Sequence, residues 1–498
     1  MADVADGQEA QLKAGAIGFV DALSIGINAT SPAYSLAAVI GPIAALAGVY
    51  APGILLASFV PMLLIASAFF YLNRVDTDCG TTFSWVTRAM GPWAGWLGGW
   101  AISMTGVLVV GSLADTGVSF TLLGLGLDSW VDNTLLRMVL VVGLIIVMTA
   151  LCVAGTEGSA KLQNVLILLQ VVFLLVFAVV AIYRALTDDS PLEGGAITPS
   201  LEWFNAFGAG GAALSAGLLL GVFAFWGWES AVNLSEETSD PSSSPGKAGI
   251  WSTVILLLTY LSVGTAVVAF AGTQWLSENA DSEEYVFADL ASAVLGDWAW
   301  IVYFSVATAA IACTQTTILP ASRTALSMAR RAALPARLGH IHPRFRTPDV
   351  STWTVAAIAA VWYVVVYNIS ENAAFDTLSA LSLLIAFYYS LTGIACAVYY
   401  RRHLTESAKN LFLIGIGPVV GSLLLIWLLV KSFIDLSDPE NSYSGVSWLG
   451  VGPPLVIGVG VFLVGVVVMI WWRVVSPRFW DEKPGVADPD LVHGTKEA

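Results

Sequence analysis

Glu229 is the residue with the clearest chemistry, because it stands deep inside a long apolar stretch that reads LLLGVFAFWGWESAVNL. A carboxylate at such depth in a membrane is costly unless it is paired or hydrated, and it therefore marks a binding site or a pathway. An ammonium group would be its natural partner, and the rings of Phe223 and Trp226 would shape the wall around a cation. The alternative is a protonated Glu229 that hydrogen-bonds to a neighbouring helix.

A second unusual segment, Gly26–Ser35, reads GINATSPAYS inside another apolar stretch. Pro32 has no N–H and disfavours helical geometry at Ser31, so the sequence predicts that the helix unwinds there. Main-chain groups freed at this depth are tolerated only inside protein or beside a water-filled cavity. The amides near Ala33 and Tyr34 would carry the positive end of a helix dipole, which suits a carboxylate. The alternative is a simple proline kink packed against neighbours.

The composition indicates an all-α integral membrane protein. Of the 498 residues, 57% are hydrophobic and only 11% are charged, and the mean hydropathy is +0.78. A soluble protein has about 25% charged residues. The net charge of −15, without any block of basic residues, excludes nucleic acid as a partner.

About twelve stretches of roughly 17 or more mostly apolar residues are each long enough to cross a bilayer as a helix. These spans are expected near 15–47, 50–72, 84–112, 134–154, 161–184, 211–234, 248–272, 297–328, 351–368, 375–399, 410–432 and 450–473. With this layout, all but three of the 21 basic residues fall on the side that holds both termini. Such a bias predicts a multi-pass plasma-membrane protein with both termini in the cytoplasm.

The cysteines and histidines predict neither a metal site nor a cofactor. Cys79, Cys152, Cys313 and Cys396 show no CxxC spacing, and the four histidines are scattered. Free thiols are the expected state.

A weak internal repeat relates two halves of the chain. Gly-Pro-Trp at 91–93 and Gly-Asp-Trp at 296–298 lie 205 residues apart, and the unusual segments at 26–35 and 223–230 lie about 197 apart. Five expected spans separate the members of each pair, so the two copies would have opposite orientations in the bilayer. Inverted halves with discontinuous first helices are typical of alternating-access carriers.

Four segments resemble the amino acid–polyamine–organocation (APC) permeases. They read FAFWGWESAVNLSEETSDP followed by SPGKA, CGTTFSWVTRAMGPWAGWLGGW, GSAKLQNVLILLQ and SRTALSMARRAALP. The resemblance covers residues 14 to 400 and implies a sodium-symporter-like (LeuT-type) fold of twelve helices, with helices 1 and 6 discontinuous. It also implies secondary transport of amino acids or related amines. The implied parts are a first inverted repeat at 14–185, a second at 211–400, two additional helices at 410–475, and cytoplasmic tails at 1–13 and 474–498.

Carried over residue by residue, the resemblance makes the first interruption the carboxylate-binding main chain and the second its opposing wall. Phe223 takes the position of an aromatic gate, and Glu229 matches an acid of the cationic amino acid and polyamine exchangers. The implied substrate-binding residues are Asn28, Ala29, Thr30, Ser31, Ala33, Tyr34, Phe223, Trp226, Gly227 and Glu229. The family's Gly-Ser-Gly-like run is replaced by Ala-Thr-Ser-Pro at 29–32, which leaves an amine without a carboxylate open as a substrate.

The expected mode is proton-linked uptake or exchange, and the alternative is sodium symport. Some proton-coupled relatives carry a lysine where this chain has Gln170, which does not titrate near neutral pH. Glu229 then remains as the candidate proton carrier. Thr314 and Thr317 would offer hydroxyls to a sodium ion, but their spacing favours the other explanation, hydroxyls bonded within their own helix.

Arg323 lies in the last third of its expected span and is a candidate for an inner gate. It would pair with an acid such as Glu236, or it would extend to the interface.

Other functions fit less well. A membrane receptor that senses amino acids without transporting them would need a larger cytoplasmic domain, and an enzyme would need a polar catalytic pair inside the bilayer. No histidine falls in an expected span, and no repeated filter or charge ring indicates a channel. The expected partners are a small amino acid or amine and the lipid bilayer, with the chain as a monomer or homodimer.

Overall fold

A computed structural model of the protein describes residues 11–279, 284–369, 371–442 and 444–487. Residues 1–10 and 488–498 of the two expected tails lie outside these ranges. The described chain is a helical bundle without a β-strand, and isolated bridges join Ile17 to Thr238 and Trp448 to Val451. The expected all-α membrane architecture is confirmed.

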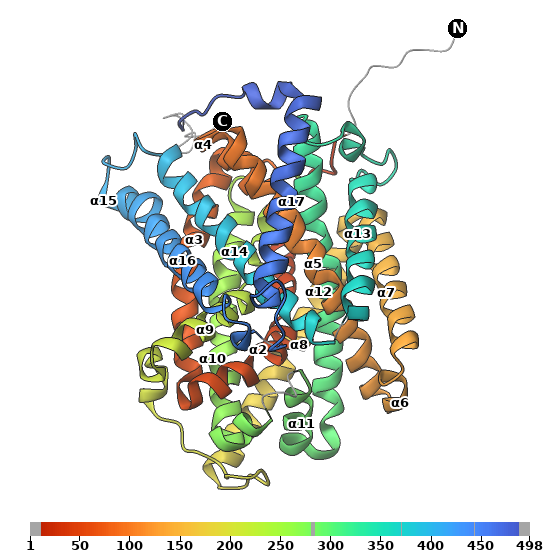
Figure 1. Ribbon diagram of the computed structural model, residues 1–498, viewed down its shortest axis with the longest axis vertical. Coiled ribbons are helices and arrows are strands. Elements are labelled where there is room, and N and C mark those ends of the chain that lie inside the picture. Colours follow the sequence, from red (N-terminus) through yellow and green to blue (C-terminus); the bar gives the residue numbers. More distant parts are fainter. Residues whose placement is uncertain (1–10, 280–283, 370, 443, 488–498) are drawn as a thin grey trace.

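The bundle consists of long helices joined by short ones (Figure 1). The long helices are α1 (Phe19–Thr30), α2 (Pro32–Ala47), α3 (Ala51–Val75), α5 (Pro92–Gly124), α7 (Thr134–Ala154), α8 (Thr156–Leu186), α9 (Gly211–Ala224), α10 (Ser244–Glu278), α12 (Trp300–Arg330), α13 (Asp349–Ile369), α14 (Glu371–Tyr399), α16 (Gly417–Asp435) and α17 (Pro453–Val475). The short elements are η1 (Gly48–Tyr50), α4 (Thr82–Met90), α6 (Asp128–Val131), η2 (Leu201–Phe204), η3 (Ala206–Ala209), η4 (Trp228–Glu237), α11 (Glu284–Leu295), η6 (Gly296–Trp298), η7 (Ala336–Gly339), α15 (Ala408–Asn410), η8 (Leu411–Ile416), η9 (Pro439–Asn441) and η10 (Pro477–Asp481).

Figure 1 shows α4 near one end of the bundle and α6 and α11 at the other, and we call these the α4 end and the α11 end. The α4 end also holds residues 11–18, the loop 76–81, the turn 238–243 and residues 476–487. Hydrogen bonds join these segments: Ile17 N–H donates to Glu237, and Gly485 N–H donates to Arg88.

Eleven segments of the described residues are long and apolar enough to cross a membrane. The first of them, Phe19–Val75, contains 57 residues, whereas about 20 helical residues cross a bilayer core. The short η1 turn separates α2 from α3 within that segment. The count of twelve depends on treating α3 as a separate crossing, and it stays a prediction.

The expected third span, 84–112, has wrong bounds. Gly91 adopts φ +99°, a conformation that side-chain-bearing residues avoid, and it divides α4 from α5. The long helix therefore runs from Pro92 to Gly124, and residues 84–90 belong to the short helix α4. Gly296, the repeat partner of Gly91, also has positive φ (+55°) and lies shortly before α12.

The interruption predicted in the first span is confirmed. Ser31 adopts left-handed angles (φ 53°, ψ 72°) between α1 and α2. Its N–H still closes the last turn of α1 on Ile27, and Pro32 then begins α2 without needing an acceptor for an N–H. The break therefore lies where the missing N–H of Pro32 costs no helical hydrogen bond.

The second interruption is also confirmed. Helix α9 ends at Ala224, and Gly227 (φ 116°, ψ −20°) precedes η4, which continues in 3₁₀ geometry. The two breaks lie against each other: a Cβ added at Gly227 would stand 2.4 Å from the carbonyl oxygen of Ala29. Only glycine permits both this φ and this approach of main chain to main chain.

We therefore expect Gly227→Ala to destabilise the protein by about 2 kcal/mol or more, because a forced contact of this kind costs ~1–3 kcal/mol before backbone strain is added. Thermal unfolding of the detergent-solubilised protein measures this. Gly143→Ala in α7 is the matched control, since a Cβ there meets nothing within 4 Å. Equal stability of the two variants would contradict the contact between the breaks.

Candidate functional site

Side chains from other helices bind the carbonyl groups that the breaks release. Cys313 Sγ of α12 donates to the carbonyl of Ala29 over 3.0 Å. Ser35 Oγ donates to the carbonyl of Thr30 over 2.6 Å, and Tyr260 of α10 donates to the carbonyl of Ala224 over 2.6 Å. Main chain that would otherwise be unpaired in the membrane is thus satisfied within the protein.

A small cavity lies between the two breaks. Its volume, measured as the space open to the centre of a water molecule, is about 10 Å³, which is room for about one water molecule. A substrate must therefore displace part of the walls. The lining residues are Ala29, Thr30, Tyr34, Ser35, Val109, Leu113, Phe223, Trp226 and Cys313.

The cavity walls divide into two chemical kinds. Val109 and Leu113 of α5 and the ring of Phe223 form an apolar side, while the break and Cys313 form a polar side. No charged side chain lies among the lining residues. A zwitterion with an uncharged, apolar side chain fits this division.

Tyr34 and Phe223 separate the cavity from the α11 end. Tyr34 lies one turn into α2 and Phe223 lies just before the second break, so both stand on that side of the cavity. Their rings meet edge to face at a centroid distance of 6.4 Å. The Tyr34 hydroxyl also lies 3.2 Å from Ser112 Oγ of α5. One pair of aromatic rings thus closes the cavity on this side.

Glu229 binds to α14 rather than lining the cavity. Its carboxylate accepts hydrogen bonds from the Tyr388 hydroxyl and from the Tyr389 hydroxyl (2.5 Å). The main-chain N–H of Gly227 donates to it as well, over 3.1 Å. These three donors satisfy a carboxylate that is only 4% exposed.

Trp226 connects this arrangement to the cavity. Its indole N–H donates to the Tyr388 hydroxyl over 2.5 Å, and its ring is part of the cavity wall. A displacement of Trp226 by a substrate would therefore disturb the donors around Glu229.

Gln170 belongs to a group of buried amides that join α1, α8 and α12. Gln170 donates to Asn28 Oδ1 over 3.1 Å, and Asn28 donates to the main-chain oxygen of Gln163 over 2.8 Å. Gln163 in turn donates to Gln315 Oε1 over 3.0 Å. These amide side chains are uncharged, so α1 is held in place without a titrating group.

The hydroxyls of Thr314 and Thr317 lie on α12 near the first break. Thr314 donates to the carbonyl of Ala310 in its own helix over 2.8 Å. Thr317 Oγ1 lies 3.6 Å from Cys313 Sγ.

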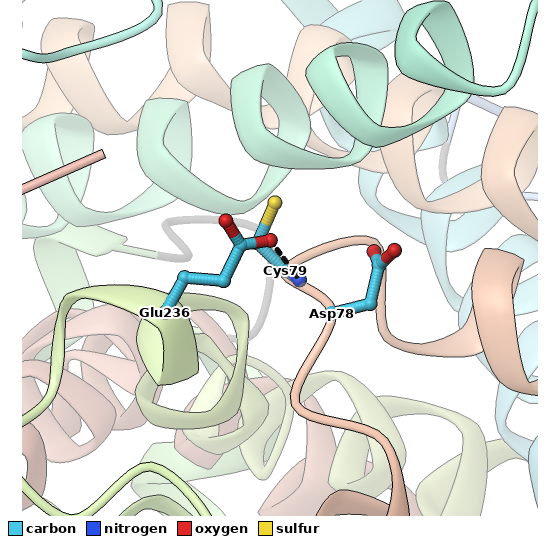
Figure 2. Close-up of side chains that lie close together, drawn as sticks. All are labelled: Asp78, Cys79 and Glu236. Atoms are coloured by element: carbon cyan, nitrogen blue, oxygen red, sulfur yellow. Dashed lines mark hydrogen bonds between the residues drawn. The ribbon is translucent and has the colours of Figure 1, made fainter. Parts of the chain in front are cut away.

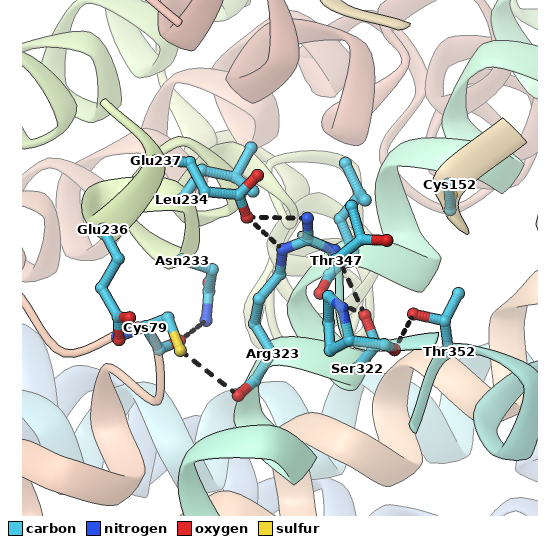
Figure 3. A network of polar contacts seen from close by, with 12 residues as sticks. Cys79, Cys152, Asn233, Leu234, Glu236, Glu237, Ser322, Arg323, Thr347 and Thr352 are labelled. Carbon is cyan, nitrogen blue, oxygen red and sulfur yellow. Dashed lines mark hydrogen bonds and ion pairs between the residues drawn. The ribbon is translucent and has the colours of Figure 1, made fainter. Parts of the chain in front are cut away.

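Arg323 forms a buried ion pair with Glu237, not with Glu236 as the sequence led us to expect (Figure 3). Its Nη2 lies 2.7 Å from Glu237 Oε1, and the two side chains are 0% and 1% exposed. Glu236 instead pairs with Arg330 over 2.9 Å. Adjacent residues of a helical turn point about 100–120° apart, so Glu237 faces Arg323 while Glu236 faces Arg330.

Figure 2 shows Asp78, Cys79 and Glu236, whose ligand-type atoms lie within 4.8 Å of one another. All three already have partners. Glu236 is bound by Arg330 and by Cys79 N–H, Asp78 by Gly80 N–H and by the Ser327 hydroxyl, and Cys79 Sγ by the Arg323 carbonyl. Burial, with Glu236 and Asp78 nearby, raises the pKa of the Cys79 thiol, and a neutral thiol is a poor metal ligand. We therefore assign this cluster to the closure of the α4 end.

We call Cys79, Glu236, Glu237, Arg323 and Arg330 the α4-end seal. It lies between the cavity and the α4 end, and hydrogen bonds of Ile17 with Glu237 and Ser239 complete it. Beside it, burial and then the neighbouring Asp78 raise the pKa of Asp76 to about 6, although Arg88 opposes the shift.

Half of the substrate-binding candidates line the cavity. They are Ala29, Thr30, Tyr34, Phe223 and Trp226. The candidates Asn28, Ser31, Ala33, Gly227 and Glu229 lie outside its lining and shape the breaks or hold them. The sequence analysis missed Val109, Leu113, Cys313 and the pair Tyr388–Tyr389. The pair carried a readable signal, because two adjacent hydroxyls inside an apolar span need partners.

Two helices broken at the centre of the bundle, with a small cavity between the breaks, are the architecture that the sequence led us to expect. A mutant of the manganese transporter of Eremococcus coleocola has the same fold, with a TM-score of 0.54, 14% identity, and coverage of 93% of this chain and 95% of that one.

The chain belongs to the amino acid permease family, whose profile matches residues 12–462. An uncharacterized transporter of Mycobacterium tuberculosis is 29% identical over 69% of this chain and 72% of that protein. The branched-chain amino acid permease of Lactococcus lactis is 23% identical over 80% and 85%. The methylthioribose transporter of Bacillus subtilis is 22% identical over 61% and 59%. The protein is thus a multi-pass plasma-membrane transporter of amino acids or related substrates.

Glu229→Gln should reduce uptake by about tenfold to a hundredfold, because one amide oxygen replaces a carboxylate that binds three donors. The amide NH₂ would also face the N–H of Gly227. Uptake into proteoliposomes measures the effect, with Glu202→Gln on exposed η2 as the control. Wild-type uptake by a folded Glu229→Gln protein would remove this residue from the mechanism.

Glu237→Gln should lower the free energy of unfolding by about 3–5 kcal/mol, because it leaves the Arg323 guanidinium buried without its counter-charge. The double variant Glu237→Leu with Arg323→Met should recover most of the loss. Thermal unfolding compares them with Asp189→Asn, which breaks an exposed pair with Arg184 worth less than ~1 kcal/mol. If the single variant behaves like Asp189→Asn, the pair is not a structural part of the seal.

Proposed function

We propose that the protein carries amino acids with uncharged, apolar side chains across the plasma membrane by alternating access. The observation that carries this proposal is the cavity between the two breaks, which combines main-chain groups with apolar walls and has no charged lining residue. Among the relatives, the branched-chain amino acid permease of Lactococcus lactis supports the substrate class.

The substrate would be bound by its two charged ends. In α2 the first intrahelical hydrogen bond runs from Ser35 N–H to the carbonyl of Ser31. The amide of Ala33 lies before it in the first turn, where N–H groups have no acceptor within the helix. This amide therefore points toward the break and suits a carboxylate. The carbonyl of Ala29 would accept from the ammonium group in place of Cys313. Val109, Leu113 and Phe223 would then enclose the side chain.

Alternating access would open one closure at a time. The aromatic contact between Tyr34 and Phe223 would part toward the α11 end, and the α4-end seal would part toward the α4 end. We assign the α4 end to the cytoplasm from the distribution of basic residues. The repeats 14–185 and 211–400 would move relative to each other, with 410–475 as additional helices, in a monomer or homodimer.

Proton coupling is proposed over sodium coupling. Glu229 is the ionisable group that contacts the second break. Trp226, which is part of the cavity wall, donates to Tyr388, one of the hydroxyls that bind Glu229. A proton on Glu229 would turn one carboxylate oxygen from an acceptor into a donor and would force Tyr388 or Tyr389 to reorient. Sodium coupling is the alternative, with the hydroxyl oxygens of Thr314 and Thr317 as its candidate ligands.

A reconstituted uptake screen tests the proposal. Leucine, valine and alanine should be taken up in competition with one another, whereas lysine, glutamate and polyamines should compete at least about tenfold more weakly, because burying an unpaired charge is costly. An imposed proton gradient should accelerate uptake and a sodium gradient should not. Preference for a cationic substrate would overturn the assigned class, and sodium-driven uptake would overturn the coupling.

A further inference from the structure

We propose that residues 477–487, which we call the C-terminal strap, lock the α4 end of the transporter in its closed state. The strap begins with η10 directly after α17 and crosses the α4 end as an extended segment. The inference rests on the proposed alternating access and adds a regulatory element that the transport site itself does not contain.

Aromatic side chains anchor the first part of the strap. Phe479 is 1% exposed and stacks on Phe83 of α4 at a centroid distance of 5.6 Å. Trp480 packs on Trp93 at the start of α5 at 4.8 Å. Phe479 also joins a small core with Met328 of α12, so it wedges between α4 and the helix that carries Arg323.

Main-chain hydrogen bonds fix the second part of the strap. Gly485 N–H donates to the carbonyl of Arg88 over 2.7 Å, and Ala487 N–H donates to the carbonyl of Tyr399 over 3.0 Å. These carbonyls lie in the last turns of α4 and α14, where helices lack internal donors. His403 Nε2 lies 3.3 Å from the carbonyl of Ala487. The strap therefore ties α4 to α14.

Helix α4 carries the loop that completes the α4-end seal. Trp85 of α4 donates to the carbonyl of Asp76 over 2.9 Å at the start of that loop. Cys79, in the same loop, donates its N–H to Glu236 over 3.1 Å and its thiol to the carbonyl of Arg323. Opening the seal separates this loop from η4 and α12. Helix α4 already contacts α14 through Thr82 and Thr392, and the strap adds to the contacts that must yield if α4 follows the loop.

The strap is suited to reversible release. Between its two anchored parts, Lys483 and Pro484 are exposed, so the strap can detach one part at a time. A bound segment with a few contacts of ordinary strength shifts an equilibrium between two states by a few kcal/mol or less. Release of the strap would therefore favour opening without unfolding the bundle.

Accessibility of Cys79 tests the lock, because this thiol is part of the seal and is fully buried while the seal is closed. The detergent-solubilised full chain is treated with N-ethylmaleimide, and labelling of Cys79 is followed by peptide mass spectrometry. Phe479→Ala removes the aromatic anchor, and Gly485→Pro removes the donor to Arg88. Gly485→Pro should label about fivefold faster than wild type, the change expected from one lost hydrogen bond of ordinary strength. Phe479→Ala should label faster still, because it removes a buried ring.

Lys483→Ala, at an exposed side chain of the same segment, should label at the wild-type rate. Thermal unfolding and size-exclusion chromatography check that each protein is folded, and Gly485→Pro serves if Phe479→Ala fails. Unchanged labelling in the folded Gly485→Pro protein overturns the lock. Labelling requires no substrate, so a failed uptake screen and a failed lock are distinguishable.

Discussion

The structure depends on one constraint: main-chain polar groups inside a membrane must find partners within the protein. Two helices nevertheless stop halfway, and the released groups become a binding surface only because other helices supply donors. Cys313 from α12 and Tyr260 from α10 satisfy carbonyls at the two breaks. The glycine at 227 then lets the two breaks touch. The cavity is the space that this arrangement leaves.

The breaks themselves could be predicted from local sequence, because their causes are local. Pro32 lacks a donor and Gly227 permits positive φ, and each acts on its own neighbours. The partners could not be predicted, since Cys313 and Tyr388 come from helices whose rotation about their axes is set by packing. The partner of Arg323, which is Glu237 and not Glu236, could not be predicted for the same reason. Adjacent residues point in different directions on either an α or a 3₁₀ turn, so the choice between them depends on how η4 is rotated against α12, which packing decides.

Glu229 has partners, as its position in the sequence indicates, but they are not the partners that the sequence suggests. Its depth in an apolar span required partners, which is what the sequence indicated. The partners are hydroxyl donors of Tyr388 and Tyr389 rather than a substrate ammonium group. A carboxylate surrounded by neutral donors is stabilised without a counter-ion. It holds the second break in place. A substrate that moved Trp226 would still affect it, because the indole N–H of Trp226 donates to the same Tyr388 hydroxyl that binds Glu229.

The two closures of the cavity differ in chemistry, and the difference follows from what each must do. The aromatic contact toward the α11 end is a single pair of rings, so in the proposed alternating access a substrate that displaces Phe223 would open it. The α4-end seal is built from ion pairs whose desolvation offsets most of their attraction. Water that enters an opening seal hydrates the separated charges, so a closed barrier of this kind resists leakage without being costly to part. Such a seal contributes little net free energy to its closed state. An additional contact such as the strap then has a decisive effect, because a small free energy is enough to choose between two nearly balanced states.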